Sequence, residues 1–152
     1  MVDPLTPEQR SRAMKRVKLR DGPLERLVQN ELRARGLKFR RHLHNLPGRP
    51  DIVFAREKVA IFVDGDFWHG YRLPLWEKKL SPFWREKLRA NRKRDRRNFR
   101  KLRACDWKVV RIWEHQLELN LRSCVERILG ALSESKGSGA SAESHLRRTP
   151  LR

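Results

Sequence analysis

The amino-acid sequence predicts an α/β fold in which helices flank a central mixed β-sheet. Along the 152 residues, strand-like runs are interleaved with helix-like runs in the order helix, helix, three strands, helix, strand, helix. This interleaving is typical of an α/β layer. The run Val59–Val63 is continuously apolar, as expected of a strand that is buried on both faces. A chain of this length is the size of one ordinary domain with one hydrophobic core.

Four segments carry helix signals: Thr6–Val17, Pro23–Arg35, Pro82–Ala104 and Leu121–Leu132. In the first, Pro7 takes the first helical position, where a missing N–H costs nothing. Apolar residues recur at helical spacing in the second, and Gly36 supplies its stop. The third is long and heavily basic, and Ser81 is its candidate N-cap.

Four runs resemble strands: Leu37–Leu43, Asp51–Ala55, Val59–Val63 and Trp107–Trp113. The segment Tyr71–Ser81, which contains Pro74, is expected to be a loop. We expect a basic helical arm at residues 1–20, a folded domain at residues 21–132 and a basic tail at residues 133–152. The tail is predicted to be disordered, because its Ser- and Gly-rich composition cannot bury a core.

The charge balance indicates a polyanionic partner. Lys and Arg number 37 against 18 Asp and Glu, which gives a formal net charge of +19. Nucleic acid is the first candidate, because each cation that neutralises a phosphate releases a counterion; a membrane surface and a generally basic composition are the alternatives. No apolar run is long enough to cross a bilayer and the N-terminus lacks a signal-peptide layout, so we expect a cytoplasmic, nucleoid-associated protein with Cys105 and Cys124 reduced.

The segment between residues 46 and 70 carries the residues for phosphodiester hydrolysis. That reaction needs a hard cation held by oxygen ligands and a group that positions or deprotonates water. Asp51 starts one predicted strand, and Asp64 and Asp66 follow the next, with His69 just beyond them. A hairpin brings the start of its first strand to the end of its second, so these side chains are expected to converge at one edge of the sheet.

Pro50-Asp51 followed by acids resembles the first part of the restriction-endonuclease-like superfamily motif. A larger set of motifs resembles the very short patch repair (Vsr) endonucleases. The set consists of Pro-Gly-Arg-Pro-Asp at 47–51, Phe-Trp-His-Gly at 67–70, Phe83-Trp84, Asn91, Arg94-Asp95, Trp107 and Trp113-Glu114. The resemblance implies a restriction-endonuclease-like fold and makes residues 21–132 an endonuclease domain.

The same resemblance implies catalytic roles. Asp51 would bind Mg²⁺ directly, with the backbone carbonyl of Val63 as a second ligand. His69 would position or deprotonate the attacking water. Glu25 and Asp95 would orient metal-bound waters, although each is equally interpretable as an ordinary ion-pair partner. Asp64 stands where some members carry histidine, and we count it among the catalytic candidates.

The resemblance also implies that Phe67, Trp68 and Trp84 enter the duplex at a mismatch, with Met14 inserted from the opposite groove. Aromatic pairs are otherwise more often core residues, and a methionine is often a core filler. Cations on the long helix are candidate phosphate contacts, with a solvated charged face as the alternative. These cations are Lys87, Arg92, Lys93 and Arg96.

One departure concerns the structural zinc that many family members hold with cysteine and histidine. The matching positions here are Asp66, Tyr71, Leu73 and His115. Because none is a cysteine, we predict no structural zinc, and expect Trp76 to help hold the loop by packing.

The function that follows is Mg²⁺-dependent nicking of double-stranded DNA at a T·G mismatch, leaving a 5′-phosphate. A restriction-like or structure-selective endonuclease without mismatch specificity is the first alternative. A non-catalytic basic nucleic-acid-binding protein is the second. The resemblance implies a monomer and makes mismatch-repair proteins candidate partners.

Overall fold

A computed structural model describes residues 22–146 of the chain, with side chains through residue 136. The predicted helix Thr6–Val17 and the candidate DNA contact Met14 lie outside the described residues. The elements run in the order α2 (Pro23–Ala34), β1 (Arg40–Arg41), β2 (Ile52–Phe54), β3 (Val59–Asp64), two 3-10 helices (Leu73–Leu75 and Glu77–Lys79), α3 (Pro82–Ala104), β4 (Lys108–Trp113), α4 (Glu114–Leu119) and α5 (Leu121–Leu146).

The four strands form one mixed sheet, which confirms the predicted fold class. Their order is β1-β2-β3-β4; the β1/β2 and β2/β3 pairs are antiparallel and the β3/β4 pair is parallel. Helix α3 carries the chain from β3 to β4, the crossover that a parallel pair requires. In the β2/β3 hairpin Ile52 pairs with Ile61, so the start of β2 lies beside the end of β3.

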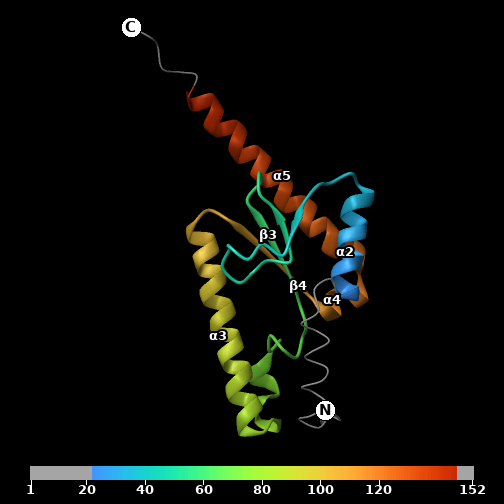
Figure 1. The fold of residues 1–152 in the computed structure, drawn as a ribbon, viewed down its shortest axis with the longest axis vertical. Helices are drawn as coiled ribbons and strands as arrows, with labels where there is room; N and C mark the ends of the chain where they lie inside the picture. Colours follow the sequence, from blue (N-terminus) through green and yellow to red (C-terminus); the bar gives the residue numbers. More distant parts are fainter. Residues whose placement is uncertain (1–21, 147–152) are drawn as a thin grey trace.

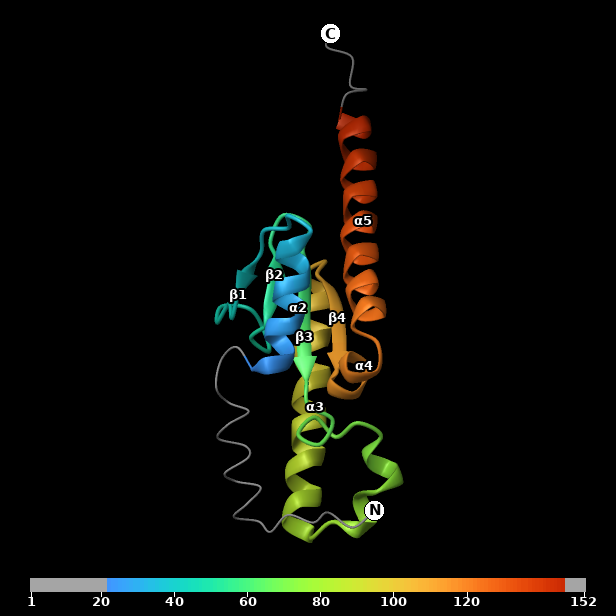
Figure 2. The same ribbon diagram turned by 90° about the vertical axis from the view of Figure 1, so that its right-hand side faces the viewer.

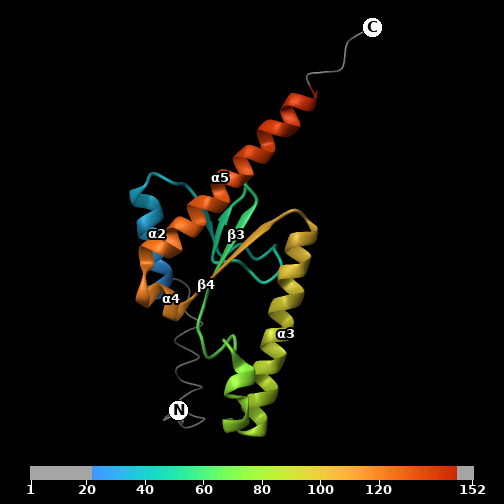
Figure 3. The same ribbon diagram turned by 180° about the vertical axis from the view of Figure 1, so that it is seen from behind.

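Both faces of the sheet are covered by helices (Figures 1 and 3), which explains why β3 is apolar at successive positions. Val59 and Ile61 pack in the larger core cluster with residues of α2 and α5, such as Ile128. Ala60 and Phe62 face the opposite side and pack with Phe99 and Leu102 of α3. A strand of period two that is buried on both sides has no polar face to display.

The N-terminal half of α3 and the loop after β3 extend past the sheet as a projecting lobe (Figure 2). Helix α3 begins as predicted, with the Ser81 hydroxyl accepting a hydrogen bond from the Trp84 N–H at 3.4 Å. The predicted loop at 71–81 contains the two 3-10 helices. Asn91 of α3 donates to the backbone carbonyl of Trp68 at 2.9 Å, which fastens the loop to the helix.

The structure departs from the sequence-based expectation in three larger respects. The strand expected at 37–43 is reduced to Arg40–Arg41, because His42 takes a φ of 51° and leaves the extended conformation. Helix α4 was not predicted. The last helix was expected to end at Leu132, with a disordered segment after it, but it continues to Leu146.

The longer α5 has a physical explanation. Extending a helix that already exists costs far less than starting one, and the added stretch contains alanine, glutamate and lysine, which favour helices. Glu134 also forms an ion pair with Lys108 of β4.

Within the part of the chain that the structure describes, no helix has the length and apolar character needed to span a membrane.

Candidate active site

The site lies at the edge of the sheet where β2 begins and β3 ends. Asp51 directly precedes β2, and its Oδ2 accepts a hydrogen bond of 2.7 Å from the Val63 N–H. The antiparallel hairpin therefore brings the two segments together as the sequence predicts. A hollow of about 510 Å³ opens here, and its lining includes all five candidate catalytic residues: Glu25, Asp51, Asp64, His69 and Asp95.

Asp51 shares the buried part of this hollow with another carboxyl group. Glu25 reaches it from the first turn of α2. Burial, with the neighbouring charge of Glu25 as the next cause, raises the pKa of Asp51 well above its usual range. Two acids that destabilise each other's charged forms in this way create a place where a cation is favoured.

His69 lies between two carboxylates. Its Nδ1 is 2.7 Å from Asp95 Oδ2, and its Nε2 is 3.3 Å from Asp64 Oδ1. Asp95 comes from α3 and Asp64 from the end of β3, so the ring is fixed by two separate elements. The shorter contact at Nδ1 sets the orientation of the imidazole and leaves Nε2 as the more weakly held nitrogen.

Arg111 of β4 joins the same two carboxylates, and sequence reasoning missed it. Its Nε donates to Asp64 at 2.8 Å and its Nη2 to Asp95 at 2.9 Å. Its guanidinium carbon also lies 4.1 Å from the centre of the Trp113 ring. The sequence signal was available, because Arg111 is a charge flanked by the apolar residues Val110 and Ile112 of a strand run, where it needs a buried partner.

The two carboxylates respond differently to this environment. Burial raises the pKa of Asp64, and the charges of His69 and Arg111 only partly oppose that effect. Burial acts in the same direction on Asp95, but the hydrogen bond and charge of His69, together with Arg111, leave the pKa of Asp95 lowered. Asp95 is therefore the stronger anionic partner of His69.

His42 is a second residue that the sequence analysis did not select. One ligand atom each from Glu25, His42 and Asp51 can be chosen so that all three lie within 4.8 Å of one another. The sequence contains no motif around His42 that marks it. Only the β1/β2 pairing places it opposite Asp51.

Aromatic side chains gather in the projecting lobe beside this site. Phe67 stacks on Trp76 with ring centroids 5.8 Å apart, and Trp68 packs edge-on against Trp84 at 5.6 Å. Trp84 is 8% exposed, whereas Phe83 is 65% exposed. We call Phe67, Trp68, Trp76, Phe83 and Trp84 the aromatic cluster.

The candidate cations lie along α3. Lys87 stands over the aromatic cluster, with its Nζ 5.3 Å from the Trp84 ring centre. Lys93 and Arg96 are exposed, and Arg92 is half-buried. Gly70, at a φ of 64°, packs so closely on Arg92 that an added Cβ would lie 2.9 Å from Cδ of that arginine. This close approach sets the helix beside the loop that carries His69.

Comparisons with known proteins decide the family. A family model described as "DNA mismatch endonuclease Vsr" matches residues 2–74. A type II nicking enzyme, V.XorIIP of Xanthomonas oryzae pv. oryzae, is 39% identical over 77% of this chain and 88% of its own length. The DNA mismatch endonuclease Vsr of Escherichia coli (strain K12) is 35% identical over 88% of each chain.

The chain belongs to the Vsr family. It is therefore a DNA endonuclease with a restriction-endonuclease-like α/β fold, and DNA is its partner. A further relative, the type II nicking enzyme V.NmeDIP of Neisseria meningitidis serogroup C, is 33% identical over 90% of this chain and 94% of its own length.

Asp66, Tyr71, Leu73 and His115, the four positions compared with zinc ligands in the sequence analysis, are joined by other contacts in this chain. His115 Nδ1 lies 2.8 Å from Asp66 Oδ1, and the Tyr71 ring lies 4.4 Å from the His115 ring. Leu73 is fully buried. The indole N–H of Trp76 donates to the Tyr71 carbonyl at 2.8 Å. A hydrogen bond between His115 and Asp66, ring packing and apolar burial thus hold the loop together.

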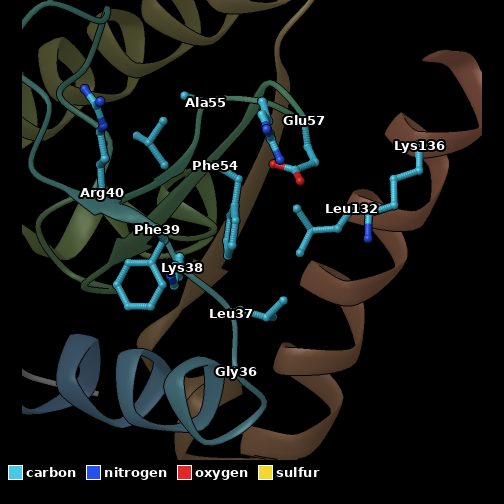
Figure 4. Close-up of a pocket in the computed structure, with 12 residues that line it drawn as sticks. Gly36, Leu37, Lys38, Phe39, Arg40, Phe54, Ala55, Glu57, Leu132 and Lys136 are labelled. Carbon is cyan, nitrogen blue, oxygen red and sulfur yellow. The ribbon is translucent and has the colours of Figure 1, made fainter.

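A second hollow, of about 460 Å³, lies between the end of α2, the β2/β3 hairpin and α5 (Figure 4). Leu37, Phe54 and Leu132 give it apolar walls, with Glu57 at the rim. It sits at the hairpin end of the strands, opposite to Asp51. Among the described residues that line it, Glu57 is the single acid and none is a histidine, so it lacks the groups for phosphodiester hydrolysis.

Proposed function

We propose that this Vsr-family endonuclease nicks one strand of duplex DNA at T·G mismatches by Mg²⁺-dependent hydrolysis, leaving a 5′-phosphate. The observation that carries the proposal is that Glu25, Asp51, Asp64, His69 and Asp95 come from separate segments and line one hollow. The aromatic cluster lies in the adjoining lobe. The printed names of the relatives, a mismatch endonuclease and several nicking enzymes, support both the mismatch and the single-strand cut.

The buried acids fit a hard cation. Carboxylate and backbone carbonyl oxygens are the ligands that Mg²⁺ takes in proteins, and the site offers the carboxylates of Asp51 and Glu25 beside the Val63 backbone. Burial and the neighbouring charge of Glu25 raise the pKa of Asp51, so a cation beside this carboxylate would stabilise its charged form. When bound, Mg²⁺ would polarise the scissile phosphate and stabilise the charge that develops on it.

His69 is the proposed group that positions the attacking water and accepts its proton. The Asp95 contact at Nδ1 favours the tautomer with a proton on that nitrogen, which leaves a lone pair at Nε2. Asp64 Oδ1 lies 3.3 Å from Nε2, so this carboxyl group borders the place proposed for the water. Water attacks phosphorus, the bond from phosphorus to the 3′ oxygen breaks, and that oxygen takes a proton from solvent. The products carry a 3′-hydroxyl and a 5′-phosphate.

The surface of α3 supplies the proposed phosphate contacts. Lys87, Arg92, Lys93 and Arg96 lie on the helix that also carries Asp95. Phosphate contacts fix register and orientation on a duplex without reading its sequence. Cations and catalytic groups on one rigid helix would therefore place the scissile phosphate relative to His69.

Mismatch selectivity is proposed to come from the aromatic cluster. Phe67 and Trp68 are partly exposed in the loop that also carries His69. Aromatic wedges that unstack bases cost less at a mismatched step, because that step is already weakened. Trp84 packs behind these rings, so it reaches a duplex only if the cluster opens.

The test is a nicking assay on two duplexes that differ only in one base pair, T·G against T·A. We expect Mg²⁺-dependent cleavage of the T-containing strand of the T·G duplex, with a 5′-phosphate that a ligase can use. Equal cleavage of both duplexes would support the restriction-like alternative. Binding without cleavage of either would support a non-catalytic DNA-binding protein.

A further inference from the structure

The metal-binding end of the site contains a nitrogen donor, His42, in addition to its acids. His42 Nε2 lies 3.5 Å from Glu25 Oε2, and both side chains are 16% exposed. Ligand atoms of Glu25, His42 and Asp51 come within 4.8 Å of one another. That separation is short enough for all three to reach a single ion with small side-chain movements, since metal–ligand bonds to oxygen and nitrogen are about 2.0–2.6 Å long.

The backbone holds His42 at this place. It follows β1 directly, and its N–H donates to the Asp51 carbonyl at 3.2 Å. Its φ of 51° lies in the left-handed region, which histidine enters more readily than most residues but still at a cost. The turn thus anchors His42 to the main chain of the proposed metal ligand, and the imidazole is directed to Glu25.

The electrostatics of the cluster favour a divalent cation. Glu25 and Asp51 are two carboxyl groups in a mostly buried position, with ligand atoms close enough to reach one ion, and like charges at this range repel. A histidine can relieve this in two ways. It can pair with Glu25, or it can give its Nε2 lone pair to a metal that both acids also hold.

We propose that His42 is a ligand of the catalytic metal together with Asp51 and Glu25, and that its nitrogen shifts the cation preference of the site from Mg²⁺ toward transition metals. The inference rests on the proposed metal-dependent function. Mg²⁺ prefers an all-oxygen shell, whereas an imidazole favours ions later in the first-row series, such as Co²⁺. The ratio of Co²⁺ to Mg²⁺ affinity is therefore set by His42.

Calorimetric titration of the full-length, DNA-free protein with CoCl₂ and with MgCl₂ tests this. The variant is His42→Gln, which keeps a polar side chain and removes the imidazole. The matched control is His44→Gln, an exposed histidine two residues away. Asp51→Asn identifies the site, because only the binding that it abolishes is assigned to this cluster. Far-UV circular dichroism checks that each variant folds.

We expect His42→Gln to weaken Co²⁺ binding at the Asp51-dependent site by roughly tenfold or more, as loss of groups around a metal typically does. Mg²⁺ binding should change much less, and His44→Gln should change neither. The visible absorption of bound Co²⁺, which reports nitrogen ligation, should also change in His42→Gln alone.

Two results would overturn the inference, and they differ from failure of the proposed function. If His42→Gln weakens Co²⁺ and Mg²⁺ by the same factor with an unchanged Co²⁺ spectrum, His42 is a counter-ion of Glu25 and not a ligand. If His42→Gln has no effect on either metal, it lies outside the metal site. If instead Asp51→Asn binds both ions like the wild type, the metal-dependent function assigned to this hollow fails.

Discussion

Replacing Arg111 by methionine probes the group that holds the two carboxylates around His69. Methionine keeps an unbranched apolar stem but removes the donors to Asp64 and Asp95. Both acids are strongly buried, at 7% and 9% side-chain exposure, while Arg111 is 22% exposed. The substitution therefore leaves two buried carboxyl groups without their arginine partner.

The expected cost follows from these contacts. Removing one partner of a buried ion pair costs about 3–5 kcal/mol, and the partial exposure of Arg111 places the estimate at about 3 kcal/mol in free energy of unfolding. For a chain of this size, that corresponds to a fall in Tm of roughly 6–12 °C. Cleavage should also slow, because Asp64 and Asp95 no longer fix His69.

The loss should depend on pH with a definite sign. Arg111 lowers the pKa of both acids relative to the variant. A carboxyl whose folded pKa is lowered stabilises the fold above its unfolded pKa, and that contribution disappears as pH falls through the folded value. The difference between wild type and Arg111→Met should thus be full near neutral pH and should shrink in acid, as the pH falls through the lowered pKa of Asp95.

Urea denaturation across pH measures this, with Arg89→Met as the matched control. Arg89 makes a two-pronged contact to Glu77 at 2.8 Å for each prong, but its side chain is 60% exposed. Exposed pairs contribute little, so the control should lose far less stability. The reasoning is refuted if Arg111→Met is no more destabilised than Arg89→Met, or if its deficit persists unchanged in acid.

Four further expectations concern the loop, the lobe and the charge. Trp68→Ala should abolish the preference for T·G over T·A duplex in the nicking assay; an unchanged preference would contradict the proposal that Trp68 unstacks bases at the mismatch. Gly70→Ala should cost about 1–2 kcal/mol, because alanine disfavours positive φ, and a melt of unchanged Tm would contradict this. Mass-spectrometric metal analysis of purified protein should find no tightly bound zinc; one zinc per chain would disprove that. The affinity for duplex DNA should fall steeply from low to moderate salt, because binding releases counterions from the phosphates. An affinity that does not change with salt would exclude phosphate contacts as the main source of binding.

Much of the fold could be predicted because its signals are local. The apolar run of β3 implied burial on both faces, and Phe62 and Ile61 do pack on opposite sides. Proline and Ser81 marked the start of α3. The short β1 and the long α5 could not be predicted, because one is ended by the conformation of His42 and the other is extended by a contact with Lys108.

Asp51 and His69 of the candidate site could be proposed because the sequence motifs and the expected position of each residue at one edge of the sheet agree. The sequence analysis did not select Arg111 and His42, because their roles depend on pairing between distant segments. Arg111 reaches the site only through the parallel β3/β4 register, in which Asp64 pairs with Trp113. His42 reaches it only through the β1/β2 pairing. Neither register can be read from local sequence patterns.

The measurement that tests the central claim most directly is single-turnover cleavage of a T·G duplex by Asp51→Asn, beside the isosteric control Asp106→Asn at an exposed aspartate. Duplex affinity is measured in parallel. We predict that Asp51→Asn still binds the duplex but no longer cleaves it with Mg²⁺. Asp106→Asn should cleave like the wild type, and EDTA should abolish cleavage by the wild type and by Asp106→Asn. Cleavage by Asp51→Asn at the wild-type rate would contradict the assignment of this hollow as the active site.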